Sequence, residues 1–444
     1  MLRLLERGEN AVVLFIQDTC APCREFKPKF EKIAQAFHRE RSVHVVAMRV
    51  TPEVMDAFPM ERLPTIGLFS PSIKRKGLKY KGPMLEQPLL DYINSRFKTH
   101  RLLNGTLDSR FGCLEALDEL TLQLVQLLLP KEKSKVDTAD GNVGRLMRRF
   151  KSAGKSLRGE EKVGHAVYVE LSEALIGISD SVGHQDQDRA SSIAGRFRQQ
   201  FFSRIENKVK EVSAKMHADP AAEKRLMQSY NIARLFQSFL DPIPKVIHFI
   251  KSDGRADNFQ VHHALAVKSA VVRSGMSVVF HCSIEPTTEA WRRIRPWVEV
   301  RETWPPWEMS PGQPLTLAAH QSDALRLKIL LAEGGIYLDW DVIVLRDMTD
   351  LLEQAATGFF LAEEKGGHVI GNAVIGAVPN SPFLSKWKRR AAHAFDPSCY
   401  TCHSVQLARA LTKEYAHLVT LLPWEEFYYP GHEEEAMAQL FDPL

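Results

Sequence analysis

The sequence has no run of about eighteen apolar residues, so no segment of it is predicted to span a membrane. Its start, from Met1 to Asn10, mixes both charge signs and lacks the apolar core of a signal peptide, which taken literally places the chain in the cytosol. Cysteines are few, 6 in 444 residues, which argues against a dense disulfide framework. The formal net charge is only +4, and no nucleic-acid partner is predicted from it.

What the chain does contain is an ordinary globular composition. Hydrophobic residues make up 44% and charged residues 25% of a chain that is too long for one typical domain. We therefore expect two or three domains.

The first feature with chemistry is a pair of cysteines behind an apolar run. The run from Ala11 to Ile16 is typical of a strand, and Cys20-Ala-Pro-Cys23 follows it at the start of an amphipathic helix. Unpaired N–H groups at a helix N-terminus stabilise a thiolate, so Cys20 is the expected attacking sulfur and Cys23 the resolving one.

Four further segments along the chain match the pattern of a known family. The chain resembles thioredoxins over roughly residues 10 to 98. The segments that carry this resemblance are the run from Val43 to Met48, Leu63-Pro-Thr-Ile-Gly-Leu-Phe69, Tyr80-Lys-Gly82 and the helical stretch from Leu89 to Phe97. The resemblance implies a cis proline at Pro64 that faces the cysteines.

Two positions depart from the thioredoxin pattern. Leu14 replaces the usual buried acid, and Thr19 replaces the usual tryptophan. A redox-competent domain and a docking or chaperone module that keeps the fold therefore remain alternatives. The residues before Ala11 are too few for the family's opening strand and helix, so we expect an incomplete N-terminus, from which a signal peptide could also be missing.

The middle of the chain, from about Arg101 to Leu240, shows helical periodicity and little strand signal, and an all-helical domain is predicted. Its basic segment from Gly144 to Lys155 is either a solvated helix face or a contact with an anionic surface. In its position and in the stretch from Lys224 to Phe236 the region resembles the all-helical domain of some protein-disulfide-isomerase-like proteins of the endoplasmic reticulum. That resemblance implies an endoplasmic reticulum or Golgi lumen, while the absence of a visible signal peptide leaves the cytoplasm open.

A third domain begins after Asp241-Pro-Ile-Pro244, where two prolines stop the preceding helix. A strand over Lys245 to Ile250, a helix over about Gln260 to Ser274 and a strand over Ser277 to His281 form a βαβ unit. The predicted fold class is thus multidomain α/β, with a thioredoxin-like domain over residues 1–100, an all-helical domain over 101–240 and a parallel-rich α/β domain over 241–444.

The centre of the third domain is a helix that ends at Gly334-Gly335, followed by a short apolar strand and Asp339-Trp340-Asp341. On the helix, Asp323 and Arg326 are three residues apart and share a face. Two carboxylates at the end of a strand suit Mn²⁺ or Mg²⁺ in complex with a diphosphate, because these cations prefer carboxylate oxygens and keep positions for phosphate and water.

Together, Ser322-Asp-x-Leu-Arg326 and Gly334-Gly-Ile-Tyr-Leu-Asp-x-Asp-Val342 resemble the sugar-nucleotide-binding region of the DXD glycosyltransferases, which include the yeast initiating α-1,6-mannosyltransferase and the α-1,4-galactosyltransferases. The resemblance implies a GT-A type fold and transfer with retention. It also implies that Asp341, and Asp339 directly or through water, hold Mn²⁺. Asp323, Arg326 and Tyr337 then contact the donor together with Asp339.

Asn372, in Gly371-Asn-Ala-Val-Ile-Gly-Ala377, matches a family position near the reacting sugar, and a turn role is the alternative. Glu363 and Glu364 either approach the acceptor or are merely exposed. Cys399-Tyr-Thr-Cys-His403 matches a haem-attachment motif and could also bind zinc, but local cysteines, disulfide-bonded in an oxidising compartment, are the default interpretation.

Aromatic residues of this domain leave two further questions open. Trp297, Trp304 and Trp307 either stack on a sugar or nucleobase or pack under a loop. Lys251 stands where the family commonly places a base-stacking tryptophan. The chain also ends before the family's usual late histidine and tryptophan segment, so either His432 substitutes or the C-terminus is truncated.

The predicted function is metal-dependent retaining transfer of a hexose from a nucleoside diphosphate sugar to a glycan, glycolipid or protein acceptor, with an attached thioredoxin-like module. The alternative is a thiol-disulfide oxidoreductase or folding helper whose glycosyltransferase-like domain only binds.

Overall fold

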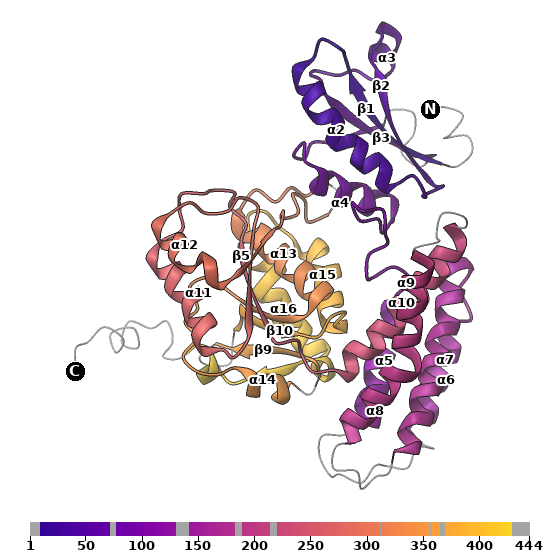
Figure 1. The fold of residues 1–444 in the computed structure, drawn as a ribbon, viewed down its shortest axis with the longest axis vertical. Coiled ribbons are helices and arrows are strands. Elements are labelled where there is room, and N and C mark those ends of the chain that lie inside the picture. Colours follow the sequence, from indigo (N-terminus) through magenta and orange to yellow (C-terminus); the bar gives the residue numbers. More distant parts are fainter. Residues whose placement is uncertain are drawn as a thin grey trace, which may run out of the picture. The chain divides into compact units, whose positions relative to one another are not determined.

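The computed structural model describes residues 9–71, 77–129, 142–182, 189–213, 220–310, 312–355, 357–364 and 369–428. The chain divides into two compact units, Met1–Phe111 with Lys215–Lys224, and Gly112–Ala214 with Arg225–Leu444 (Figure 1). Over the described ranges, no helix combines the length and the apolar character needed to cross a membrane.

The first unit is built on a four-stranded sheet in the order β2-β1-β3-β4. Strand β1 pairs in parallel with β2 and antiparallel with β3. The elements are β1 (Asn10–Ile16), α2 (Ala21–Ala36), β2 (Val43–Arg49), α3 (Pro52–Ala57), β3 (Thr65–Phe69), β4 (Leu78–Lys79) and α4 (Glu86–Phe97).

The centre of this sheet is apolar because β1 is buried along its length. Leu14 is fully buried, and Phe15 stacks on Phe58 with ring centroids 5.0 Å apart. The position where thioredoxins usually carry a buried acid is therefore part of the hydrophobic core. The peptide bond between Leu63 and Pro64 is cis, as the sequence predicted.

The second unit starts with helices and continues into a seven-stranded sheet. Its helical part consists of α5 (Glu115–Leu128), α6 (Asn142–Ala153), α7 (Gly159–Ser181), α8 (Arg189–Phe197), a π-helical turn (Arg198–Phe202), α9 (Ser203–Ser213) and α10 (Pro220–Leu240). Figure 1 shows these helices side by side. Helix α5 contacts α6 and α7, and also α15 of the following part.

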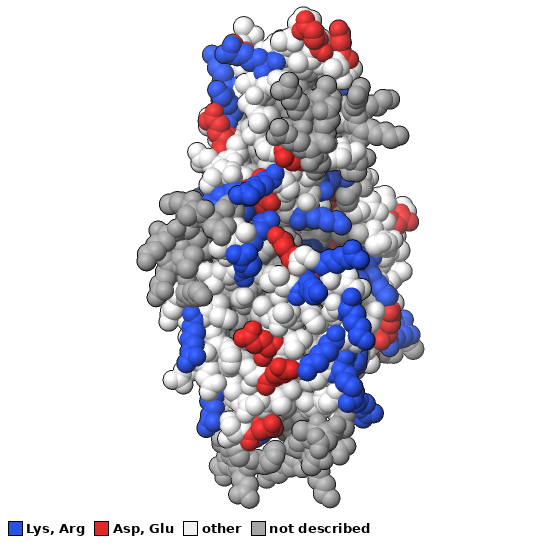
Figure 2. Space-filling model, turned by 90° about the vertical axis from the view of Figure 1, so that its right-hand side faces the viewer, with Lys and Arg blue, Asp and Glu red and all other residues white. Residues whose placement is uncertain are grey.

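The basic segment within the bundle is largely helix α6. Lys151 forms an ion pair with Glu173 at 3.0 Å, and the Arg149 guanidinium donates a hydrogen bond to the Gln123 side chain. Figure 2 shows acidic side chains among the basic ones on the face that it draws. The paired charges favour the interpretation of this segment as a solvated helix face.

The seven-stranded sheet has the order β11-β9-β10-β8-β5-β6-β7. Strands β8, β5, β6 and β7 run parallel, whereas β10 is antiparallel to both β8 and β9. The strands are β5 (Val246–Lys251), β6 (Ser277–Cys282), β7 (Glu299–Glu302), β8 (Gly335–Leu338), β9 (Phe359–Glu363), β10 (Ile370–Ala377) and β11 (Thr420–Leu422).

Helices and single helical turns connect these strands. They are α11 (Val261–Arg273), α12 (Glu289–Ile294), η3 (Arg295–Trp297), α13 (Ala318–Glu333), α14 (Thr349–Gln354), α15 (Pro382–Ala394), the π-helical turn η4 (Cys402–Gln406), α16 (Leu407–Glu414), η5 (Ala416–Leu418) and η6 (Trp424–Glu426). Helix α13 contacts β5, β8, β10 and α15, so it is covered on several sides. This explains why polar residues of α13 are buried along with its leucines.

The glycine pair after α13 makes the turn into β8 possible. Gly334 and Gly335 have φ of 69° and 97°, a region that residues with a Cβ rarely adopt. A Cβ on Gly335 would also lie 2.6 Å from the Val246 carbonyl oxygen. Only glycine therefore lets β8 start directly behind the helix and beside β5.

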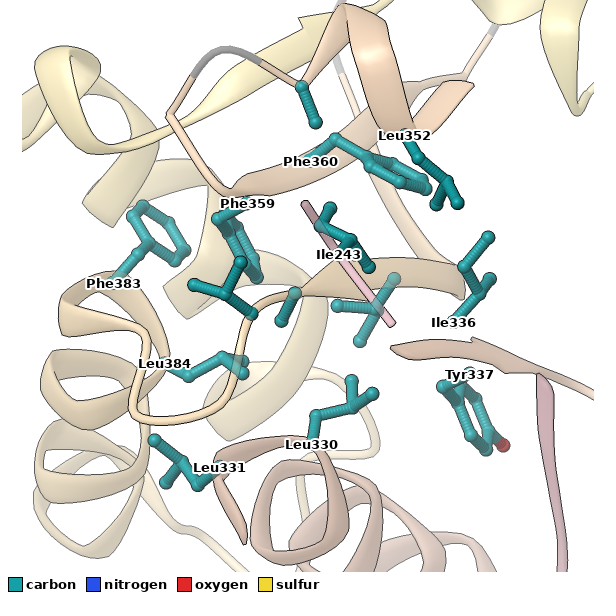
Figure 3. Packing of buried hydrophobic residues seen from close by; sticks show 14 of the residues in the cluster. Ile243, Leu330, Leu331, Ile336, Tyr337, Leu352, Phe359, Phe360, Phe383 and Leu384 are labelled. Carbon is teal, nitrogen blue, oxygen red and sulfur yellow. The ribbon is translucent and has the colours of Figure 1, made fainter. Parts of the chain in front are cut away.

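The core beneath the site is a continuous cluster of buried apolar side chains that runs from the helical part into the sheet. Figure 3 shows Leu330 of α13 and Ile336 of β8 facing the aromatic residues of β9. The Tyr337 ring lies at the edge of the drawn cluster with its hydroxyl directed away from it. The predicted multidomain α/β fold class is confirmed, and the domain boundaries at residues 100 and 240 stay predictions.

Candidate glycosyl-donor site and thiol site

Two residues of α13 belong to the candidate donor site, and helical spacing places them on one face. Arg326 Nη2 lies 3.2 Å from Asp323 Oδ1, and the two side chains are only 7% and 11% exposed. Buried charges of this kind are stable only when they are paired and hydrogen-bonded.

The other residues come from two antiparallel neighbours in the sheet. Because β8 and β10 are antiparallel, Asp339, which follows β8, lies beside the first residues of β10, among them Asn372. The backbone N–H of Asp339 donates to the Ala373 carbonyl at 2.8 Å, which continues the strand pairing. The carboxyl end of β8 therefore brings Asp339 beside Asn372 and below α13.

Arg326 is the centre of the cluster. Its Nη1 donates to the Asn372 carbonyl oxygen at 2.7 Å, and Nη2 lies 3.3 Å from Asp339 Oδ1. Its guanidinium carbon lies 4.3 Å from the centroid of the Tyr337 ring, as in a cation–π contact. Burial opposes the charge on Arg326, but Tyr337, Asp339 and Asp323 outweigh it and raise the pKa of the guanidinium.

Asp323 has partners for both carboxylate oxygens. Asn372 Nδ2 donates to Oδ1 at 3.1 Å, and His403 Nε2 lies 3.3 Å from Oδ2. Burial alone would raise the pKa of Asp323, but the Arg326 charge and the nearby polar groups of His403 and Ser404 lower it. Asp323 is thus held as a carboxylate.

Asp339 is in the opposite situation. Its side chain is 29% exposed and accepts a hydrogen bond from the Tyr337 hydroxyl. Desolvation raises the pKa of Asp339, and the carboxylates of Asp341 and Asp323 raise it further, so that Arg326 and Tyr337 do not compensate fully. The charge of Asp339 is therefore incompletely balanced by protein groups.

Contacts with α11 hold the turn that carries Asp341, while Asp341 itself is exposed. Trp340 stacks on His263 of α11 with ring centroids 4.2 Å apart and an interplanar angle of 14°. The backbone N–H of Val344 donates to the Ser269 hydroxyl at 2.8 Å. The described residues include no group of three or more His, Cys, Asp or Glu side chains placed to hold a metal ion.

The structure brings together Asp323, Arg326, Tyr337, Asp339 and Asn372 of the residues predicted from sequence, with Asp341 on the adjoining turn. A pocket is lined by Asp323, Arg326, Asn372, His403 and Ser404, with Met309 and Trp387 among its apolar walls. Glu363 lies in β9, and His432 lies outside the described residues.

The aromatic alternatives are partly resolved by local contacts. Trp297 is 58% exposed, with Lys268 Nζ 3.5 Å from its ring centroid. Trp304 Nε1 donates to Glu302 at 2.9 Å. At the position of the family's base-stacking tryptophan, Lys251 is buried and its ammonium contacts Asp253, so this side chain has a structural partner.

Three residues at the site were not predicted from the sequence, His403, Ser404 and Tyr428. Cys399 and Cys402 form a disulfide directly before His403, in agreement with the default interpretation of that motif. The Tyr428 hydroxyl lies so close to Gly371 that a Cβ there would clash with it at 1.8 Å. The only sequence signal for His403 was its place in C-x-x-C-H, a pattern whose usual associations are haem and zinc.

The thiol site lies in the first unit. Cys20 is the N-cap of α2, its Sγ accepts a hydrogen bond from the Cys23 backbone N–H at 3.2 Å, and the two cysteines form a disulfide. Cys23 is buried, Cys20 is partly exposed, and Pro64 is buried. The partly exposed sulfur at the helix N-terminus is the one that the sequence predicted as the nucleophile.

Two family models match parts of this chain. The family described as "Glycosyltransferase sugar-binding region containing DXD motif" matches residues 286–357, and the thioredoxin family matches residues 3–95. Glucan organizing enzyme 1 of Cryptococcus neoformans var. grubii is 30% identical over 201 residues, which cover 42% of this chain and 54% of that protein. Protein disulfide-isomerase tigA of Aspergillus niger is 32% identical over 118 residues, covering 26% of this chain and 33% of that protein.

The chain thus spans about half the length of the first of these relatives and a third of the second. Among solved structures, PaToxG Glycosyltransferase is similar over 45% of this chain and 75% of that chain, at 16% identity and a TM-score of 0.30, which is too low to establish a relationship. The chain combines a thioredoxin domain with a glycosyltransferase sugar-binding region that contains a DXD motif.

Proposed function

We propose that this chain is a metal-dependent, retaining glycosyltransferase that moves a hexose from a nucleoside diphosphate sugar to a glycan, glycolipid or protein acceptor. The observation that carries the proposal is the buried cluster in which Arg326 lies within 3.3 Å of both Asp323 and Asp339, at the carboxyl end of β8. Ligands of α/β sheets collect at that edge of the strands. A small cavity of about 10 Å³ adjoins the cluster on the side of His403.

The donor set fits a divalent cation. Asp339 has a raised pKa because its desolvated carboxylate faces Asp341 and Asp323, so a cation at this edge would supply the missing positive charge. The exposed carboxylate of Asp341 and that of Asp339 would hold Mn²⁺ or Mg²⁺, with the remaining positions left to phosphate and water oxygens. When bound, such a cation neutralises the negative charge that develops on the departing diphosphate.

The protein residues have separate tasks in this proposal. The Asp323 carboxylate, ionised at neutral pH, accepts hydrogen bonds from sugar hydroxyls and so orients the hexose. Arg326 keeps both carboxylates in place, because it is already bonded to Asp323, Asp339 and the Asn372 carbonyl. Fixed dipoles and charges of this kind lower the barrier because they need no rearrangement during the reaction. Asn372 Nδ2, bonded to Asp323, stands beside the sugar position.

The thioredoxin module suggests the compartment and the type of acceptor. Both C-x-x-C pairs are disulfide-bonded, as expected for a protein of the endoplasmic reticulum or Golgi lumen, and one relative is named a protein disulfide-isomerase. A glycoprotein that exposes cysteines is an acceptor that this module could hold.

A second candidate function rests on the thiol site. Cys20 at the N-terminus of α2 has the position of a reactive thiol, so the chain could act as a thiol-disulfide oxidoreductase or folding helper with a glycosyltransferase-like domain that only binds. Comparing Asp341→Asn with Cys20→Ala in one complementation assay separates the two functions. Loss of complementation in the cysteine variant alone would favour the second.

The main test is a donor screen by nucleotide release. Purified full chain is incubated with UDP- and GDP-sugars with and without Mn²⁺, and Asp341→Asn serves as the matched control. We expect Mn²⁺-dependent release from at least one donor and its loss in Asp341→Asn. Absence of both transfer and hydrolysis with every donor would count against the proposal.

A further inference from the structure

His403 is a buried histidine at the donor site that lies outside the DXD region. It belongs to the π-helical turn η4, directly after the Cys399–Cys402 disulfide, and its side chain is 1% exposed. Its Nε2 lies 3.3 Å from Asp323 Oδ2. A turn from far along the chain therefore contacts Asp323, the carboxylate for which the family resemblance implies a contact with the donor sugar.

The rest of the His403 ring has apolar or aromatic surroundings. His320 packs edge-on at a centroid distance of 4.7 Å, and Phe395 packs edge-on at 5.2 Å. The backbone of His403 is fixed as well, because Trp387 Nε1 donates to its carbonyl oxygen at 3.1 Å. Packing on these sides leaves the ring little freedom to rotate, so Nε2 is held at Asp323.

The two oxygens of Asp323 are served by different elements. Oδ1 is bonded by Asn372 of β10 and lies 3.2 Å from Arg326, whereas Oδ2 faces His403. Rotation about χ2 moves both oxygens together, so the contact at Oδ2 adds to the contacts at Oδ1 in fixing the carboxylate. His403 thus contributes a further point of attachment, next to Ser404.

We propose that His403 is a positioning residue of the donor site, which holds Oδ2 of Asp323 so that the carboxylate keeps one orientation toward the donor sugar. This role rests on the proposed function, because it requires that Asp323 contacts a nucleoside diphosphate sugar. It does not require His403 to touch the donor.

The test compares two amide substitutions of different reach. In His403→Gln the amide nitrogen can occupy the place of Nε2, whereas in His403→Asn it is one methylene shorter and falls short of Oδ2. Kinetics of donor hydrolysis with Mn²⁺ and the donor sugar that the wild type accepts give KM and kcat for each variant. His393→Asn on α15 is the control, because His393 is exposed.

We expect His403→Asn to raise the KM for the donor by about tenfold, the size of one lost polar contact to a charged group. His403→Gln should recover most of the affinity, and kcat should change by less than about twofold in both. A merely structural role would instead lower the fraction of folded enzyme, which reduces the apparent kcat at constant KM. In that case the donor KM would not differ between His403→Gln and His403→Asn.

A second measurement uses the protein without donor. Urea unfolding of His403→Asn, Asp323→Asn and the double variant yields the coupling between the two side chains, and we expect their effects to be non-additive. Additive effects, or an unchanged donor KM in His403→Asn with an active wild type, would overturn the role of His403 alone. A wild type that hydrolyses no donor would overturn the proposed function and this role with it.

Discussion

Replacing Arg326 by leucine removes the cation that lies between the buried carboxylate of Asp323 and the partly buried carboxylate of Asp339. In the wild type its guanidinium lies 3.2 Å from Asp323 and 3.3 Å from Asp339 and donates to the Asn372 carbonyl. Leucine fills part of the volume but offers no positive charge. Both carboxylates would then remain desolvated without their main partner, which is more costly than the loss of the contacts themselves.

The expected size follows from the burial of the groups. The side chains of Asp323 and Asp339 are 11% and 29% exposed, so water replaces the lost guanidinium poorly at Asp323 and only in part at Asp339. Removing one member of a buried ion pair typically costs about 3–5 kcal/mol in free energy of unfolding. We expect Arg326→Leu to fall in this range at pH 7.5.

The loss should depend on pH with a defined sign. Removing Arg326 raises the folded-state pKa of both carboxylates relative to the wild type, because its positive charge lowers both. A carboxyl group with a raised folded pKa destabilises the protein when it is ionised and ceases to do so as it is protonated. The deficit of Arg326→Leu should therefore be largest at pH 7.5 and shrink as the pH falls toward about 5.

Urea unfolding at these two pH values measures the effect directly. Arg292→Leu is the matched control, because Arg292 is 66% exposed and pairs with Glu289 on the same helix. Its stability should stay within experimental error of the wild type. An Arg326→Leu variant as stable as the wild type, or one whose deficit is independent of pH, would refute the charge balance described for the cluster.

Three other changes have expected outcomes. Cys399→Ser should lower the free energy of unfolding by roughly 2 kcal/mol in calorimetry, since the disulfide closes a short loop, with Cys113→Ser as the unbridged control. Dithiothreitol also reduces the Cys20–Cys23 disulfide, so it should lower the stability of the wild type by at least as much. Cys20→Ala should abolish insulin reduction by the full chain, and equal turnover in the wild type and this variant would exclude the redox reading. Gly335→Ala should lower the melting temperature because its φ is 97° and the new Cβ would meet the Val246 carbonyl oxygen at 2.6 Å, a result that unchanged melting would contradict.

The parts of the donor site that could be predicted from sequence are those with local spacing. Asp323 and Arg326 share a helix face because they are three residues apart, and the glycine pair marks the turn into β8. Leu325 and Ile329 of the same helix are buried. Local geometry of this kind is determined by neighbours along the chain and is therefore readable without a fold.

The residues that the sequence did not reveal reach the site through tertiary structure. His403 approaches Asp323 from a turn behind α15, and Tyr428 approaches Gly371 from the last described residues. Neither has a characteristic spacing to the DXD region. The burial of His320 on α13 was also not predicted, because the helix is covered on the side of η4 as well as by the sheet.

The charge balance at Asp339 is understood only from the sequence and the structure together. The sequence places two carboxylates around Trp340, but only the structure shows that Asp339 is partly desolvated while Asp341 is exposed. This difference is what favours a cation at the edge of the sheet.

The most direct test of the proposed donor site is a crystal structure of the full chain with Mn²⁺ and the nucleoside diphosphate sugar that the donor screen selects. We predict the cation at Asp341 and Asp339, the diphosphate beside it and the hexose hydroxyls within hydrogen-bonding distance of Asp323. A donor that binds with measurable affinity at another place in the chain, with this cluster empty, would contradict the assignment of the site.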